Sequence, residues 1–477
     1  MKEFVRGLLV FAVFLIPALA TQSEDSPPIA LLHATTIDRH GRAAQPDQTI
    51  IIAGNQVVAE GPANQTKVPK NALVVDASGK FVISGLWDMH VHIAGLNAEP
   101  AWSKEVLLPV LLASGIVGVR DMGGDLAALG KWRTEVQNHS LAAPAIVASG
   151  AWLAAGGKRT REQIPVANAD EARAAVREIK VSGADFVKII SLPSRDAFFA
   201  VAEEAKKQNI AFVGHLPFTV SALEASNAGM KSIEHLFYSG FSVSVSSKEA
   251  ELRPRLVAAQ AQHNDAAWEQ IRQEAEGSGS PDKALVLAQA FQRNGTWLTP
   301  TLASLEITGH PERWNTEDPS LAFVPAALAA EWRALLKDEK MKRNAAWLAR
   351  QSAGDGRLAA ALFHAGVPIL AGSDSLDPFV FPGDSLHREL AELVRAGLTP
   401  LEALQAATSA PEKYLRSGGA VSRDSSGASF VVLDANPLVD IANTRKISAV
   451  VYGGKYLDRA KLDSMLAGAK SAAAAVK

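Results

Sequence analysis

The sequence predicts an α/β fold: a (β/α)8 TIM barrel with a small β-sandwich domain built from both chain ends. Apolar runs with the composition of β-strands recur through the middle of the chain, and segments with helical periodicity separate them. Short β-like runs with turn residues between them occur near both ends. Alternating strands and helices favour a parallel sheet, and eight such repeats favour a closed barrel.

Eight apolar runs make up the predicted barrel. They occupy residues 81–92, 116–122, 143–150, 184–190, 211–216, 232–237, 296–302 and 368–374. Residues 196–208 are typical of the segments between them, with helix-forming residues in a helical period. A doubly wound sheet is the alternative, but no glycine-rich phosphate-binding turn follows an early strand.

Domain boundaries follow from the same patterns. We expect the first part of the β-sandwich at residues 29–83, the barrel at 84–416 and the second part of the β-sandwich at 417–460. Two spacers, 239–294 and 303–365, are longer than a barrel needs, and both are charged and helical in pattern. Because they follow the sixth and seventh strands, we expect them either to form solvated cover or to roof a pocket.

Composition excludes several classes of protein. The 477 residues carry a net charge of −2 with no large basic block, which excludes the electrostatic surface typical of a nucleic-acid-binding protein. Hydrophobic residues make up 48% and charged residues 21%, as in a soluble globular protein. The chain has no cysteine, so disulfides and thiolate ligands are excluded, and any metal must bind nitrogen and oxygen.

Residues 1–20 have the pattern of a signal peptide. Lys2 and Arg6 precede a short apolar run, and Ala18-Leu19-Ala20 matches a small-residue cleavage site. The apolar run is shorter than a membrane-spanning helix, and a buried N-terminal helix is the alternative. We expect cleavage after Ala20 and an exported protein, periplasmic or extracellular, without membrane attachment.

Polar side chains end the predicted strands. His90 and His92 close the first run, and residues i and i+2 of a strand face the same side. The later strands contribute Lys188, His215, His235 and Asp374. Because the carboxyl ends of barrel strands meet at one rim, these six side chains should converge and bind a divalent metal. Taken singly, each has an ordinary alternative: a hydrogen-bonded core histidine, a paired lysine or a helix-capping aspartate.

This arrangement resembles the amidohydrolase superfamily, which has H-x-H on strand one, lysine on four, histidines on five and six, and aspartate on eight. The resemblance covers nearly the whole chain after residue 20. It includes G-L-W-D-M-H-V-H (85–92), V-R-D-M-G-G (119–124), A-G-L-T-P-L-E-A-L-Q-A-A-T (396–408) and V-V-L-D-A-N-P-L-V-D-I (431–441). Within the superfamily, the sequence is most similar to imidazolonepropionase-related and Xaa-Pro dipeptidase (prolidase-like) hydrolases.

The resemblance implies a binuclear metal site. Lys188 would be carboxylated by CO₂ to a carbamate that bridges two divalent ions. His90, His92 and Asp374 would hold one ion, and the other would be held by His215 and His235. A hydroxide shared by the ions would attack the substrate, with Asp374 moving its proton to the leaving amine. Zn²⁺ is the expected metal, and Mn²⁺, Co²⁺, Ni²⁺ and Fe²⁺ suit the same ligands.

Four further residues are candidates around this site. Tyr238 follows strand six, where a phenol could stabilise an oxyanion, and His387 opens the helix after strand eight, where a histidine is common in similar proteins. Lys158 stands where relatives often carry histidine in a G-G-H motif. Lys158 or Arg195 could pair with a substrate carboxylate, although an ordinary solvated loop is the alternative.

The sequence therefore predicts an exported enzyme that hydrolyses an amide bond in a small substrate, such as a dipeptide or an N-acyl amino acid. A lactonase or phosphotriesterase-like hydrolase and a mononuclear cyclic-amide hydrolase or deaminase are the enzymatic alternatives. A barrel kept as a binding scaffold is the non-enzymatic one. Self-association into a homo-oligomer is compatible with all of these.

Overall fold

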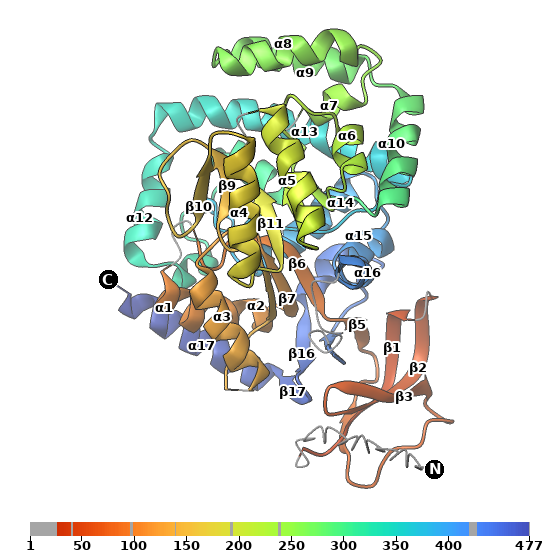
Figure 1. The fold of residues 1–477 in the computed structure, drawn as a ribbon. Coiled ribbons are helices and arrows are strands. Elements are labelled where there is room, and N and C mark those ends of the chain that lie inside the picture. Colours follow the sequence, from red (N-terminus) through yellow and green to blue (C-terminus); the bar gives the residue numbers. More distant parts are fainter. Residues whose placement is uncertain are drawn as a thin grey trace, which may run out of the picture.

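A computed structural model describes residues 26–39, 42–95, 99–138, 140–190, 194–236, 240–418 and 427–476. It has the predicted α/β class, with one large sheet near the chain ends and two parallel sheets within a layer of helices (Figure 1). The expected signal peptide, residues 1–20, and Tyr238 lie outside the described residues. Among the described helices, none combines the length and apolar character needed to cross a membrane.

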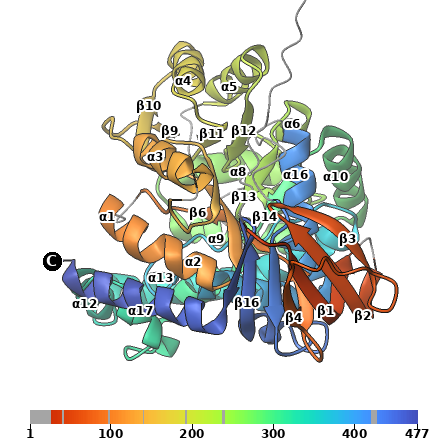
Figure 2. The ribbon, with the colours of Figure 1, turned by 90° about the horizontal axis from the view of Figure 1, so that it is seen from below.

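Both ends of the chain contribute to the large sheet. Its strands are β1 (Ile29–Arg39), β2 (Arg42–Ala53), β3 (Gln56–Pro62), β4 (Leu73–Asp76), β5 (Phe81–Ser84), β15 (Phe430–Leu433), β16 (Ile447–Tyr452) and β17 (Lys455–Asp458). The order is β17-β16-β15-β5-β1-β2-β3, and β4 also pairs with β1. The early and late strands meet where β15 runs antiparallel to β5, with Phe430 opposite Ser84. Figure 2 shows the early strands, in red and orange, beside the late strands, in blue. Buried residues such as Ile50 and Val451 form its own small core.

The two other sheets contain only parallel pairs. One sheet is β6 (Leu86–Val91), β7 (Ile116–Asp121) and β8 (Ala145–Ala148). The other has β9 (Trp152–Ala155), β10 (Gln163–Val166), β11 (Phe186–Ile189), β12 (Ala211–Gly214), β13 (Ser232–Glu234) and β14 (Trp297–Thr299).

Residues 368–375 run between these two sheets. The backbone N–H of Leu370 donates to the Leu298 carbonyl at 2.9 Å, which joins the segment to β14. On its other side, the N–H of Met89 donates to Ala371 at 2.9 Å, which joins it to β6. Thus the first and the last apolar runs of the predicted barrel lie side by side, and the side chains at their ends approach each other.

The strands differ from the sequence prediction in three places. The run 81–92 divides at Gly85 into β5 and β6, which belong to different sheets, so the prediction of one continuous strand was wrong. Gly85 is required because an added Cβ would lie 2.4 Å from Val117. Residues 368–375 form no named strand, and within them Ile369 and Ser375 make isolated bridges to Leu298 and Val91. Finally, β9 and β10 form an added parallel pair after β8 that the sequence patterns did not predict.

The described helices surround the parallel strands or lie beyond their ends. They are α1 (Pro100–Trp102), α2 (Leu108–Ala113), α3 (Leu126–Gln137), α4 (Ala169–Val181), α5 (Arg195–Lys207), α6 (Ala222–Asn227), α7 (Phe241–Ser244), α8 (Glu249–Ala261), α9 (Asp265–Gly277), α10 (Pro281–Asn294), α11 (Leu302–Gly309), α12 (Ala326–Leu335), α13 (Glu339–His364), α14 (Asp384–Ala396), α15 (Pro400–Ala406), α16 (Ser409–Gly418) and α17 (Arg459–Ala475). Short π and 3-10 turns are η1 (Ser103–Leu107), η2 (Pro311–Arg313), η3 (Pro319–Phe323) and η4 (Ile441–Arg445). Capping boxes begin α6 at Ser221 and α15 at Thr399, which satisfies the free N–H groups of those helix starts.

The two long spacers are helical, as predicted. The first contains α7 to α10, and α8 and α9 lie beyond the ends of the strands at the top of Figure 1. The second contains α11, α12 and the long α13. A buried ion pair between Arg272 of α9 and Asp355 of α13 joins the two spacers. The helices of the two spacers therefore contact each other and form one connected layer.

Gly214 at the end of β12 provides a test of this packing. Its φ is +130°, and an added Cβ would lie 1.9 Å from the carbonyl oxygen of Ile189 in β11. We expect Gly214→Ala to lower the free energy of unfolding by about 3 kcal/mol or more, because neither backbone can move without breaking the sheet. Urea unfolding measures the change.

Gly130→Ala is the matched control. Gly130 lies within α3, and an added Cβ would meet nothing within 4 Å. This change should raise the free energy of unfolding by up to about 1 kcal/mol, because alanine favours helices. Equal effects of the two substitutions would show that the β11–β12 contact is not as close as described.

Candidate metal centre

Asp374 lies at the centre of a cluster of histidine side chains. Its Oδ1 atom is 3.3 Å from His90 Nε2 and 3.5 Å from His92 Nε2. Its Oδ2 atom is 3.8 Å from Nδ1 of His235. The His90 and His92 ring centroids are 5.5 Å apart, so both imidazoles of the H-x-H motif reach the same carboxylate. Three segments far apart in the sequence thus place their side chains together.

His215 and Lys188 complete the predicted group. The His215 ring lies 4.9 Å from the His235 ring, centroid to centroid. Lys188 is 1% exposed within β11, and its charge acts on all four imidazoles of the group, those of His90, His92, His215 and His235. Burial lowers the pKa of Lys188 to about 8, although the carboxylates of Glu234 and Asp374 oppose the shift. All six residues chosen from the sequence therefore face one region.

Unusual backbone conformations help to direct these side chains. His235 and Asp374 both have positive φ, 59° and 53°, in the left-handed region that costs a non-glycine residue about 1–3 kcal/mol. The Asp374 N–H donates to the His90 carbonyl at 2.8 Å. The buried carboxylate of Asp88 accepts from the Ser373 N–H at 2.9 Å, just before this turn. These backbone bonds hold the end of β6 in register with the end of the run 368–374.

Hydrogen bonds on the outer nitrogens determine how the rings present their inner nitrogens. Nδ1 of His90 donates to Glu234 Oε2 at 2.9 Å, and Nδ1 of His92 donates to the Gly123 carbonyl at 3.2 Å. Nδ1 of His235 lies 2.6 Å from Thr301 Oγ1, whose own hydroxyl donates to the Pro300 carbonyl. Each Nδ1 is therefore the donor, so the proton of His90 and of His92 lies on Nδ1 and their Nε2 atoms face Asp374.

Burial favours the neutral imidazole, the form that can bind a metal, at His90 and His235. Burial lowers the pKa of His90 well below its ordinary value and that of His235 to about 4. Burial alone would raise the pKa of Asp374, but contacts with His90 and His235 hold it well below its usual range. Burial also opposes protonation of His92, yet its hydrogen bond with Asp374 gives it a raised pKa.

These donors fit a divalent cation. The Nε2 atom of His90 is buried without a hydrogen-bond partner among the described residues, and such an atom is costly unless something binds it. One ligand atom each from His90, His235 and Asp374 lie within 4.8 Å of one another. Imidazole nitrogen and carboxylate oxygen are the ligands that Zn²⁺ and its neighbours prefer.

This compact trio contains His235, whereas the family resemblance groups His92 with His90 and Asp374.

Two buried charged residues beneath the histidines were missed by the sequence analysis. Arg120 of β7 and Glu234 of β13 are both 0% exposed, and they form an ion pair at 2.9 Å. The signal was present, since each is a charged residue inside an otherwise apolar strand. It was not used because charge in an apolar run does not show which partner will neutralise it.

The predicted substrate-binding cations have different surroundings. Arg195, at the start of α5, forms a forked pair with Glu224, with Nη1 3.2 Å from Oε2, and also bonds the Thr219 carbonyl. Its charge is therefore already balanced within the protein. Lys158 is exposed in the loop between β9 and β10. His387 contacts Thr444 at 2.9 Å and the Ser114 carbonyl at 3.1 Å, which gives it a structural role between α14 and η4.

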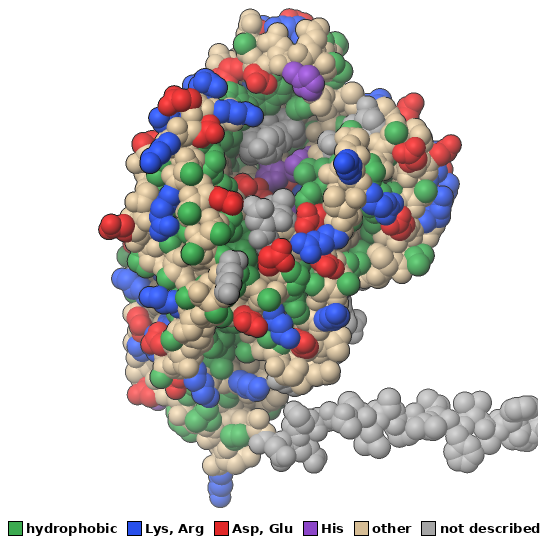
Figure 3. Space-filling view, turned by 90° about the vertical axis from the view of Figure 1, so that its left-hand side faces the viewer, with side chains coloured by type: hydrophobic (Ala, Val, Ile, Leu, Met, Phe, Trp, Pro, Cys, Tyr) green, Lys and Arg blue, Asp and Glu red, His purple; other side chains and the backbone are tan. Residues whose placement is uncertain are grey.

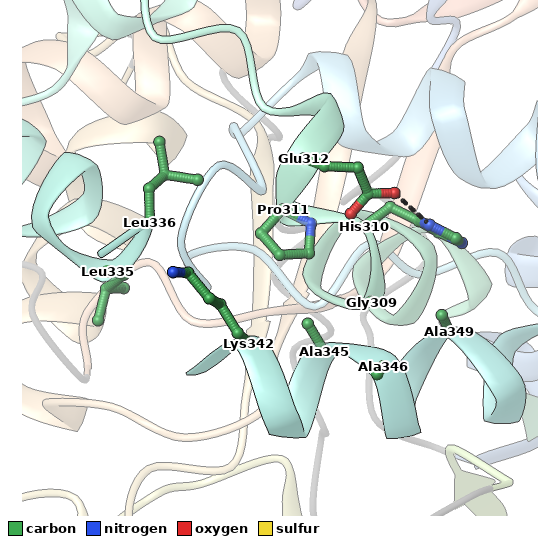
Figure 4. Close-up of a pocket in the computed structure, with 10 residues that line it drawn as sticks. All are labelled: Gly309, His310, Pro311, Glu312, Leu335, Leu336, Lys342, Ala345, Ala346 and Ala349. Carbon is green, nitrogen blue, oxygen red and sulfur yellow. Dashed lines mark hydrogen bonds and ion pairs between the residues drawn. The ribbon is translucent and has the colours of Figure 1, made fainter. Parts of the chain in front are cut away.

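The surface is hollowed on one face, and histidine side chains lie within the hollow (Figure 3). A separate cavity of about 480 Å³ lies between α11, the end of α12 and α13. Apolar side chains line much of it, with Lys342 and the His310–Glu312 pair at its edges (Figure 4). None of the six predicted metal-site residues lines this second cavity.

Comparison with known proteins agrees with this geometry. The model of the amidohydrolase family matches residues 81–457, so the chain belongs to this family and the resemblance seen in the sequence is confirmed. It is accordingly a hydrolase that acts on carbon–nitrogen bonds, in a family that generally uses divalent metal ions. No curated protein matches the sequence.

Solved structures of several hydrolases share the fold. A putative prolidase from Bifidobacterium longum is 22% identical over 93% of this chain and 99% of that chain, with a TM-score of 0.64. Bottromycin amidohydrolase is 22% identical over 94% and 91%, with a TM-score of 0.67. A Xaa-Pro dipeptidase with methionine bound in its active site is 19% identical over 90% and 100%, with a TM-score of 0.64.

Removal of the central carboxylate tests the metal centre. We expect Asp374→Asn to weaken Zn²⁺ binding by at least about 100-fold, because Asn lacks the negative charge and even outer contacts of metal sites change affinity by about 10–100-fold. Competition with a coloured chelator measures the dissociation constant. His387→Gln removes a buried histidine outside the cluster and should leave Zn²⁺ affinity unchanged; an equal loss in both variants would contradict the proposed ligand set.

Proposed function

We propose that the protein is an exported, binuclear metal-dependent amidohydrolase, with a (β/α)8 barrel and a flanking β-sandwich, that cleaves an amide bond in dipeptides or N-acyl amino acids. The observation that carries the proposal is the buried contact of Asp374 with His90, His92 and His235. The barrel closes in this proposal through residues 368–375, which hydrogen bond to both β14 and β6.

The two metal ions have separate protein ligands in this proposal. His90, His92 and Asp374 hold one, and His215 and His235 hold the other. When bound, the ions polarise the scissile carbonyl and lower the pKa of the attacking water. Lys188 would serve both ions as a carbamate: its ammonium group loses one proton, the free amine forms a C–N bond with CO₂, and a second proton is released, so that a poorly solvated cation becomes an anion.

Asp374 performs the proton transfers. Its carboxylate is held ionised by the surrounding imidazoles, so it can accept a proton from the attacking water. It then donates this proton to the leaving nitrogen as the carbon–nitrogen bond breaks. Tyr238, the residue proposed to donate to the oxyanion, follows β13 in the sequence, three residues after His235.

Substrates with a free carboxylate are favoured. The similar solved proteins include a putative prolidase and a Xaa-Pro dipeptidase, whose names denote dipeptide hydrolysis. Arg195 is already paired with Glu224, so Lys158 is the better of the two proposed cations for binding that carboxylate. Ester and lactone substrates test the lactonase or phosphotriesterase-like alternative.

A mononuclear cyclic-amide hydrolase or deaminase is the second candidate. It is favoured by the compact trio of His90, His235 and Asp374, which offers three ligand atoms for one ion. In that case Lys188 would remain an amine, and bicarbonate would have no effect on metal content or rate.

A substrate screen with metal analysis on the same sample decides between these functions. We expect two metal ions per chain, with content and rate that increase with bicarbonate, and hydrolysis of dipeptides or N-acyl amino acids rather than lactones. Lys188→Ala should lose most activity and one of the two ions. One metal per chain and indifference to bicarbonate would support the mononuclear enzyme, and the absence of bound metal would support a binding scaffold.

Export makes a separate prediction about the mature chain. Residues 1–20 contain the basic, apolar and small-residue segments of a signal peptide. Protein recovered from a secreting host should begin at Thr21, which N-terminal sequencing measures. Retention of Met1 in the folded, active protein would contradict export by this route.

A further inference from the structure

We propose that Glu234 and Arg120 are positioning residues that prepare His90 to bind metal, and that this preparation distinguishes His90 from His92. The inference rests on the metal site of the proposed function, and adds a hierarchy among its ligands. The chain of contacts is Arg120–Glu234–His90, which runs across the interior beneath the rim.

The contact between Glu234 and His90 is fully buried. The two side chains are 0% and 1% exposed, and Glu234 Oε2 accepts from His90 Nδ1 at 2.9 Å. A carboxylate acceptor holds the proton on Nδ1 and increases the electron density at the opposite ring nitrogen. That opposite nitrogen, Nε2, is the atom that lies 3.3 Å from Asp374 and has no hydrogen-bond partner among the described residues.

Arg120 holds the carboxylate in place. Its Nη2 atom donates to both oxygens of Glu234, at 2.9 and 3.0 Å. Its remaining N–H groups donate to the Met89 carbonyl at 2.6 Å and to the hydroxyls of Ser232 and Tyr414. A buried carboxylate without a cation would be costly, so Arg120 both neutralises Glu234 and fixes its direction.

The second histidine of the H-x-H motif, His92, has a neutral acceptor on Nδ1 instead. His92 donates to the carbonyl of Gly123, whereas Nδ1 of His235 faces both the hydroxyl of Thr301 and, at 3.8 Å, the Asp374 carboxylate. Charge-assisted hydrogen bonds are roughly twice as strong as neutral ones. His90 should therefore be the stronger nitrogen donor of the two H-x-H histidines, and its preparation should matter more for affinity.

The neighbours of Glu234 make its replacement by glutamine informative. Oε1 accepts from Ser232 and Arg120, so the single oxygen of a glutamine would be held there. The amide NH₂ would then face Nδ1 of His90 and donate to it. That contact would move the ring proton to Nε2 and remove the lone pair needed for metal.

Zn²⁺ affinity, measured by chelator competition, is the primary test. We expect Glu234→Gln to weaken binding by about 10–100-fold and to change the absorption spectrum of the Co²⁺-substituted protein. Arg120→Lys keeps the positive charge but loses the paired hydrogen bonds to both oxygens of Glu234. We expect it to weaken Zn²⁺ binding less, by about 10-fold or less. Thermal unfolding of each metal-free variant shows how much stability is lost at the same time.

Arg272→Lys is the matched control for a purely structural effect. Arg272 is also a buried arginine paired with a buried acid, Asp355, but it joins α9 to α13. We expect it to lower the melting temperature and leave the Zn²⁺ dissociation constant unchanged. A Glu234→Gln protein that melts lower but binds Zn²⁺ as tightly as wild type would overturn the inference.

Two outcomes separate this inference from the proposed function. Wild-type protein that binds no divalent metal would refute both, whereas wild type that binds metal with Glu234→Gln unaffected would refute only the inference. Should neither variant fold, nitrogen-15 spectra of histidine-labelled wild type report the His90 tautomer directly. A proton on Nε2 in the metal-free protein would overturn the inference, and a proton on Nδ1 would support it.

Discussion

Asp374 and the imidazoles around it impose one requirement on the whole molecule: polar donors and acceptors placed inside an apolar interior must all find partners. Nδ1 of His90 is paired with Glu234, and Nδ1 of His235 is paired with Thr301. An unsatisfied buried polar group costs about 1–3 kcal/mol, so Nε2 of His90 destabilises the fold by about this much unless a ligand binds it. The arrangement is therefore more easily understood as a prepared binding site than as a collection of core histidines.

Carboxylates organise the backbone as well as the site. Asp88 accepts from the N–H groups of Ser373 and His90, and Asp121 accepts from those of Ile93 and Gly123. Burial raises the pKa of Asp88 to about 7. These acids bind the backbone at the ends of β6, β7 and the run 368–374. The histidines of β6 and Asp374 are therefore held on segments whose own backbone hydrogen bonds are satisfied.

Much of the site could be predicted because its signals are local. His90 and His92 are one residue apart at the end of an apolar run, and strand geometry alone predicts that both face one side. Lys188 lies near the carboxyl end of β11, and Asp374 is the last residue of the apolar run 368–374. The repeated order of apolar runs and helices likewise predicts the α/β class without knowledge of any contact.

Features that depend on distant partners could not be predicted in this way. The sequence gives no local sign that Arg195 will pair with Glu224, or that Glu234 will be held by Arg120. The division of 81–92 into β5 and β6 also depends on a distant strand, because β5 pairs with β15 near the other end of the chain. Left-handed residues such as Asp374 are likewise selected by their surroundings rather than by propensity.

The pairing of β5 with β15 has a consequence for biosynthesis. As the chain leaves the ribosome, the early strands have no complete sheet to join, since their last neighbours are synthesised after the entire catalytic region. Until then an open β edge is available to other chains, and closing it requires contact across most of the polypeptide, which slows folding. The enzyme thus becomes fully assembled only near the end of translation, and a nascent chain is more vulnerable to aggregation than the finished molecule.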